Sequence, residues 1–186
     1  EFEQLDVAFA TMLGSTEKAD KLVKNMLNFA AKTPFEIKEI GGVVKNLIAV
    51  GINSEDVLST LKSLGDVAAG LSVPVSRLAL NFGQIKTQGK LTGRELRDFA
   101  MAGVPLTAEL ARMLGKSEAA ITKMVSKGAI GFDKVNQAFI NMTSSGGRFE
   151  NLMQKQSKTI GGMWSNFKDL ITLSVKDYQS ELVPMF

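Results

Sequence analysis

The sequence of 186 residues contains neither cysteine nor histidine. The absence of cysteine excludes disulfides and thiolate metal sites, and the absence of histidine removes the commonest metal ligand and the usual general base. Both absences argue against catalysis. We therefore expect a protein that is not an enzyme, has no catalytic residues, and binds no metal or cofactor.

The sequence also has little excess of charge of one sign, because 22 lysines and arginines are balanced by 19 aspartates and glutamates, for a net charge of +3. So small a surplus does not indicate a nucleic-acid-binding surface. The longest stretch without a charged residue, 135–147, contains Asn, Gln, Thr and Ser, and is shorter than the roughly 18 apolar residues of a membrane span. We expect neither a specific nucleic-acid partner nor a membrane span.

The composition that remains is that of a folded protein, with 45% hydrophobic and 22% charged residues. The chain starts at Glu1 without a methionine, and both of its ends fall inside helix-like patterns. We therefore expect a folded fragment of a longer protein.

Apolar residues recur at helical spacing along most of the chain, while the alternation typical of strands is scarce. The predicted fold class is therefore all-α, an irregular bundle of about nine to ten helices. The spacing predicts helices over residues 2–13, 15–31, 35–50, 54–70, 75–87, 92–102, 106–114, 117–127 and 132–142. Several of them are followed by a glycine that can adopt the left-handed conformation of a helix end, namely Gly14, Gly51, Gly89, Gly103, Gly115 and Gly128.

The segment 54–70 carries a signal for each end of a helix. Ser54 can cap the N-terminus of a helix, with the acidic Glu55 and Asp56 in its first turn. Apolar residues then line one face, and Gly70 is predicted to end the helix.

The last forty or so residues have a different pattern, in which a three- and four-residue spacing from Met153 to Leu170 is apolar at every position except Gln156. This pattern predicts one long helix over 148–182, roughly 50 Å in length. We expect residues 1–147 to form a compact helical domain, and residues 148–186 to form a long C-terminal helix that packs on the domain and projects from it. Such a helix could also mediate homo-oligomerisation.

Two short motifs resemble catalytic ones but are incomplete. The Gly-Lys-Ser at 115–117 lacks the earlier glycine of a phosphate-binding loop, since position 110 is Leu110. Ser15 and Lys18 have the spacing of a penicillin-recognising Ser-x-x-Lys motif, but the companion elements are missing. An N-terminal helix cap at Ser15 explains that motif better.

A helix-turn-helix remains as an alternative over residues 110–130, where one helix ends at Gly115 and Ser117 can cap the next. The second helix offers no Arg, Asn or Gln to recognise base edges, and Lys123 and Lys127 could reach only phosphates. A nucleic-acid-binding or regulatory helical domain is therefore the alternative to a protein-interaction domain.

The densest basic stretch is a candidate surface for docking against an acidic protein. Acidic residues are interleaved within it, so a solvated helix face is the simpler interpretation. Aromatic and apolar residues of the predicted C-terminal helix are a second candidate. The residues concerned are Lys86, Lys90, Arg94 and Arg97 in the basic stretch, and Trp164, Phe167 and Ile171 in the C-terminal segment.

Several longer stretches resemble the conserved domain of bacteriophage and prophage tail tape measure proteins. They span most of residues 6–169. These stretches are DVAFATMLGS (6–15), FAAKTPFE (29–36), LKSLGDVAAGL (61–71), FGQIKTQGKLTGRELRDFAMAGVPL (82–106), SKGAIGFDKV (126–135) and MTSSGGRFENLMQKQSKTIGGMWSNFKD (142–169).

This resemblance implies a structural role in tail assembly and tail length determination through protein–protein contacts, with no catalytic residues. It implies the tail tube protein, the tail assembly chaperones and the tail tip or initiator proteins as partners. It also implies a location in the host cytoplasm during assembly and in the tail lumen of the virion. The chain cannot be the whole ruler, because even one unbroken helix of its length would reach only about 280 Å.

Overall fold

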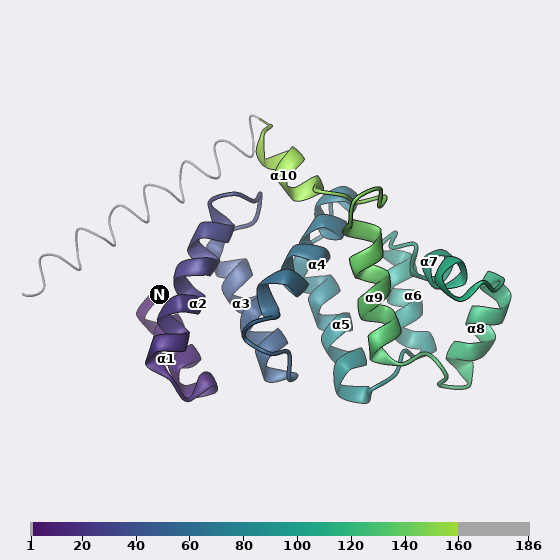
Figure 1. The fold of residues 1–186 in the computed structure, drawn as a ribbon, viewed down its shortest axis with the longest axis horizontal. Coiled ribbons are helices and arrows are strands. Elements are labelled where there is room, and N and C mark those ends of the chain that lie inside the picture. The colour runs from purple at the N-terminus through teal and green to yellow at the C-terminus, as the bar shows by residue number, and fades with distance from the viewer. Residues whose placement is uncertain (1, 160–186) are drawn as a thin grey trace, which may run out of the picture. The chain divides into compact units, whose positions relative to one another are not determined.

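The computed structural model describes residues 2–159, which form ten α-helices and no β-strand (Figure 1). The all-α fold predicted from the sequence is confirmed, as is the number of helices. The helices are α1 (Phe2–Leu13), α2 (Thr16–Ala30), α3 (Ile37–Ala49), α4 (Val57–Leu71), α5 (Val75–Gln88), α6 (Gly93–Met101), α7 (Leu106–Leu114), α8 (Glu118–Ser126), α9 (Phe132–Thr143) and α10 (Leu152–Ser157).

The six glycines expected to end helices all have a positive φ, as the prediction requires. Gly115, at φ 59°, is an example, because its N–H donates to the carbonyl of Ala111 and thereby closes α7. The expected cap at Ser15 is also confirmed, since its hydroxyl accepts from the N–H of Lys18 at 3.3 Å.

Both predicted boundaries of the helix over 54–70 are wrong. Residues 54–56 form a turn in which the carbonyl of Asn53 accepts from the N–H groups of Asp56 and Val57, so α4 begins only at Val57. Gly70 lies inside the helix, and Ser72 adopts the left-handed conformation after it. A Cβ at Gly70 would be 2.6 Å from the Phe149 ring, which shows that this glycine permits a close side-chain approach.

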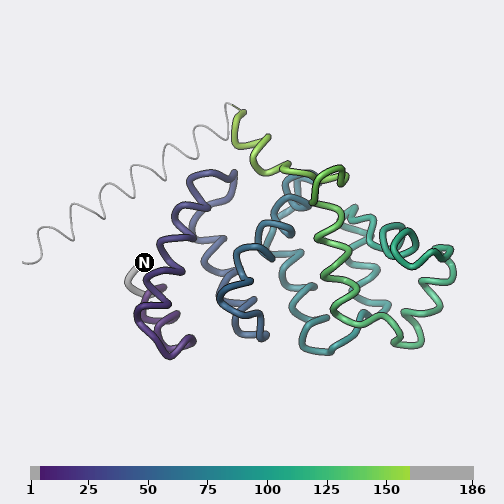
Figure 2. Tube along the Cα trace, viewed as in Figure 1, coloured from purple at the N-terminus to yellow at the C-terminus, as the bar shows by residue number. Residues whose placement is uncertain are grey.

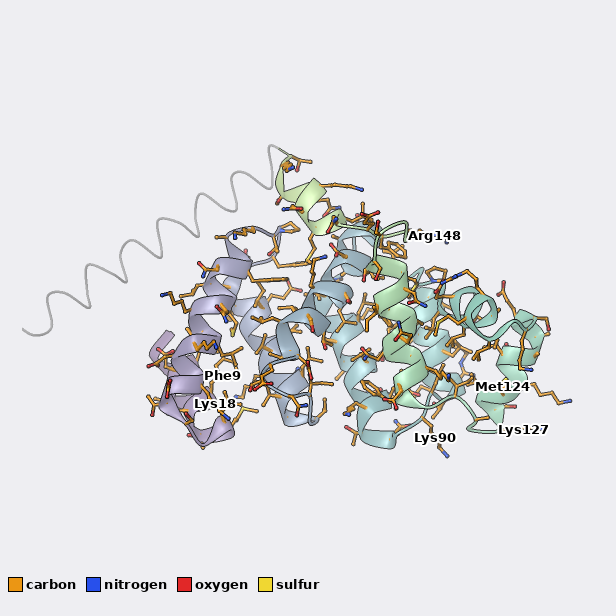
Figure 3. All side chains as sticks on the ribbon, viewed as in Figure 1. Phe9, Lys18, Lys90, Met124, Lys127 and Arg148 are labelled. Carbon is orange, nitrogen blue, oxygen red and sulfur yellow. The ribbon has the colours of Figure 1, made fainter. Side chains whose placement is uncertain are left out.

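The described residues belong to two compact units, whose boundaries fall within α3 and at the start of α10. The first comprises residues up to Gly41 together with those from Met153 onward. In it, α1 packs on α2, Phe9 and Met26 are fully buried, and Gly41 lets the Leu5 side chain approach the α3 backbone. Figure 3 labels Phe9 in this unit.

The second unit comprises Gly42–Leu152 and contains helices α4 to α9. Its core includes a cluster of four phenylalanines, in which Phe139 of α9 contacts Phe82 of α5 at 5.6 Å and Phe99 of α6 at 5.4 Å between ring centroids. Phe132, at the start of α9, also contacts Phe82 at 5.0 Å. Helices α5 and α6 pack on each other as an antiparallel hairpin (Figure 2). Helix α9 packs on α4 and α7, and its phenylalanine rings contact both helices of the hairpin.

A single antiparallel bridge joins two turns of this second unit, one between α5 and α6 and the other between α8 and α9. It pairs Lys90 with Gly131. The N–H of Leu91 donates to the carbonyl of Ile130 at 2.8 Å, and the N–H of Phe132 donates to the carbonyl of Gly89 at 3.2 Å.

The predicted long helix does not begin at Arg148. Residues 148–151 form turns, α10 spans only Leu152–Ser157, and a turn and a bend follow at 158–159. The N–H of Phe149 donates to the carbonyl of Met142 at 2.8 Å, and Asn151 has a φ of 52°, so this segment folds back on α9 before α10 starts. Residues 160–186, which include most of the predicted helix, lie outside the described range. The expected domain boundary after Gly147 stays a prediction.

Candidate functional site

The N-terminus of α6 is built by a capping box within the predicted basic stretch. The hydroxyl of Thr92 accepts from the N–H of Arg94 at 3.3 Å and donates to the carboxylate of Glu95, whose residue is only 1% exposed. Burial by itself raises the pKa of this carboxyl. Hydrogen bonds from the Thr92 hydroxyl, the backbone at Glu95 and Thr92, and the Gln88 side chain outweigh burial, and hold the pKa of Glu95 below its ordinary 4.5.

We expect Glu95→Gln to lower the free energy of unfolding by about 1 kcal/mol at pH 7, because it removes the charged partner of the cap. A lowered pKa stabilises the fold above the unfolded-state pKa, and this stabilisation is lost as pH falls through the folded-state pKa. The difference between wild type and variant should therefore be constant down to about pH 5 and shrink below it. Urea denaturation at several pH values measures this.

Glu118→Gln is the control for that experiment, because it removes an exposed carboxylate from the first turn of α8. Glu118→Gln should change the free energy of unfolding by less than about 0.5 kcal/mol. An equal loss for both variants, or a Glu95→Gln difference that persists at low pH, would contradict the assignment.

Two of the four basic residues predicted as a docking surface lie near the C-terminus of α5. Lys86 is half-buried, and its ammonium lies 4.7 Å from the centroid of the Phe132 ring, so it points towards α9. Lys90 is exposed in the turn, with its side chain against Gly128. Figure 3 labels it together with Lys127, which follows the C-terminus of α8. Cations near helix C-termini are stabilised by the helix dipole, which explains these positions without a partner.

The other two, Arg94 and Arg97, are exposed on α6. Arg97 is two positions before Phe99, whose ring contacts α9, so the two side chains point about 200° apart around the helix. The structure therefore places Arg94 and Arg97 on one face of the hairpin and Lys86 on the other. The expected interaction role of all four stays a prediction. Trp164, Phe167 and Ile171 lie outside the described residues.

Large exposed apolar side chains are a feature that was not predicted from the sequence. Met101 of α6 is 77% exposed and Leu80 of α5 is 56% exposed. Leu80 falls outside the buried stripe formed by Leu78, Phe82 and Ile85, so a helical projection of α5 could have identified it.

Two clefts of the second unit have mixed polar and apolar linings. One, of about 670 Å³, lies between the residues preceding α4 and helices α4 and α9, and it includes Lys62, Lys86 and Asp133. The other, of about 450 Å³, includes Glu109 and Arg112, which form an exposed ion pair, and Arg148. No group of three or more metal-ligating side chains occurs within residues 2–159.

The helix pair expected for a helix-turn-helix is present, because α7 packs on α8 after the turn at Gly115. The exposed face of α8 includes Glu118, Thr122, Lys123 and Ser126. One acidic and one basic residue, with none of the side chains that pair with base edges, do not favour recognition of DNA by this helix.

Comparisons with known proteins identify the family. No match was found among curated proteins, and none among solved structures. None of the helices in the described range is long and apolar enough to cross a membrane. The model of a family described as tape measure protein matches residues 1–180, which include every described helix. The chain therefore belongs to the tape measure protein family, the structural proteins of phage tails.

Proposed function

We propose that this chain acts in the assembly of the phage tail and in determining its length, by protein–protein contacts and without catalysis. The observation that carries the proposal is the family match over residues 1–180. The match covers the folded units themselves, because it includes every described helix.

In this proposal, the folded helices give the long tape measure protein a recognisable end during assembly. Their partners are the tail tube protein, the tail assembly chaperones and the tail tip or initiator proteins. The protein would act in the host cytoplasm while the tail is built and lie in the tail lumen of the virion. The packed core of the second unit supports this role, because a rigid scaffold holds surface residues in fixed relative positions.

The test uses a variant of the phage that encodes this chain with Gly147→Ala. This change is expected to destabilise the second unit, because a Cβ at position 147 would be 2.5 Å from the carbonyl oxygen of Met142. At a temperature where the purified variant is unfolded and the wild type is folded, we expect few tails or tails of uncoupled length in electron micrographs. Immunoblotting establishes that the full-length variant is present.

Gly42→Ala is the matched control, because it makes the same chemical change at an exposed helical position where the new methyl group meets nothing within 4 Å. Tails should then form in normal number and length. Normal tails with the unfolded Gly147→Ala protein would refute the proposal.

A further inference from the structure

The outer face of the α5–α6 hairpin carries two exposed apolar side chains, Leu80 and Met101. Leu80 is two positions before Phe82, and Met101 is two positions after Phe99. Both phenylalanine rings contact Phe139 of α9. Because two positions turn a helix by about 200°, Leu80 and Met101 both point away from α9.

The hairpin also places these two side chains at about the same distance from its connecting turn. Leu80 stands about two turns before the end of α5, and Met101 about two turns after the start of α6, so each is roughly 12 Å from the connecting turn. The helices pack against each other, and packed helices have axes about 8–10 Å apart. Leu80 and Met101 therefore form one apolar patch across the groove between α5 and α6.

Arginines surround this patch. Arg77 lies one turn before Leu80 on α5, while Arg97 lies one turn before Met101 on α6, with Arg94 one turn further. All three are exposed, and within residues 2–159 none of them forms an ion pair.

Few acidic residues balance these charges. Helix α5 has no acidic residue, and of the two in α6, Glu95 is buried in the capping box, which leaves only the half-buried Asp98. The outer face of the hairpin is therefore apolar at its centre and positively charged around it.

We infer that this outer face, formed by Arg77, Leu80, Arg94, Arg97 and Met101, docks an acidic amphipathic helix of another tail or assembly protein. The charge pattern argues for that occupant, since glutamates and aspartates beside an apolar stripe would complement arginines beside an apolar patch. Arginine and methionine are also enriched at protein interfaces. This inference rests on the proposed function and names the partner chemistry of one surface.

The binding experiment uses the full chain and a synthetic amphipathic helix of about 18 residues, with leucines at i, i+3, i+4 and i+7 spacing and glutamates on its flanks. Its counterpart has lysines in place of the glutamates. We expect the glutamate peptide to bind saturably, with a Kd below about 1 mM, and to shift NMR signals of α5 and α6. The lysine peptide should bind at least about tenfold more weakly.

Two variants test the face itself. The triple charge reversal R77E/R94E/R97E should weaken binding of the glutamate peptide at least about tenfold and favour the lysine peptide. L80S/M101S should abolish binding of both peptides. The control K18E/K21E/K24E makes the same charge change on exposed positions of α2 and should bind as wild type does. Circular dichroism checks that each variant is folded.

Equal binding of the two peptides, no saturable binding, or shifted signals confined to other helices would each overturn the inference. A phage whose protein carries L80S/M101S, and in which that protein is folded, should form at least about tenfold fewer tails. If those tails are normal while Gly147→Ala abolishes tails, the docking surface is wrong and the proposed function stands. If both variants give normal tails, the proposed function itself fails.

Discussion

Replacing Phe139 with alanine is expected to lower the free energy of unfolding by about 4 kcal/mol. Phe139 is 1% exposed, and its ring contacts both Phe82 and Phe99, so it joins α9 to each helix of the hairpin. The loss combines a cavity in the core with two aromatic contacts worth about 1 kcal/mol each. Urea denaturation followed by far-UV circular dichroism measures the change.

The neighbouring Ile140→Ala is the control, because Ile140 is 39% exposed and removing its side chain opens no closed cavity. We expect a loss of about 1 kcal/mol or less. Phe139→Leu keeps more of the side-chain volume than alanine does, so its loss of unfolding free energy should fall between those of the other two variants. If Phe139→Ala cost no more than Ile140→Ala, the phenylalanine cluster would not be the centre of this unit.

Replacing Gly147 with alanine is expected to cost about 3 kcal/mol, although it adds only one methyl group. A Cβ at this position would be 2.5 Å from the carbonyl oxygen of Met142 and 2.6 Å from that of Asn141. These are backbone atoms at the end of α9, which cannot move aside as a flexible side chain can. The turn after α9 must therefore shift, and Phe149 N–H loses its alignment with Met142.

The thermodynamic control for this variant is again Gly42→Ala. Gly42 lies in the interior of α3 with open space around it, so alanine should stabilise the protein by about 0.5–1 kcal/mol. A Gly147→Ala protein as stable as wild type would show that the turn adapts without strain.

Most of the fold could be predicted because helix periodicity and glycine helix ends are local signals. The start of α4 could not be predicted. Ser54 is a residue type that often caps helices, but here the carbonyl of Asn53 accepts the hydrogen bonds that form the turn before α4. Likewise, Gly70 resembles a helix end, yet the backbone continues past it and Phe149 packs there from a distant part of the chain. Such non-local contacts have no signature in a single segment.

The candidate surface was predicted only in part for the same reason. Proximity in sequence grouped Lys86 with Arg94 and Arg97, but Lys86 is one turn from Phe82 and so faces α9 with it. Arg77 and Leu80 are further from Arg97 in sequence, and only the antiparallel packing of α5 on α6 brings them to the same face.

The bridge between Lys90 and Gly131 has a consequence for how the protein is made. The two backbone segments of the bridge come from turns separated by three helices. The α5–α6 turn therefore cannot form the bridge until the polypeptide has been synthesised through the start of α9. A nascent chain that has emerged only as far as α6 lacks both this bridge and the α9 phenylalanines. The second unit can therefore complete its core only once α9 has left the ribosome.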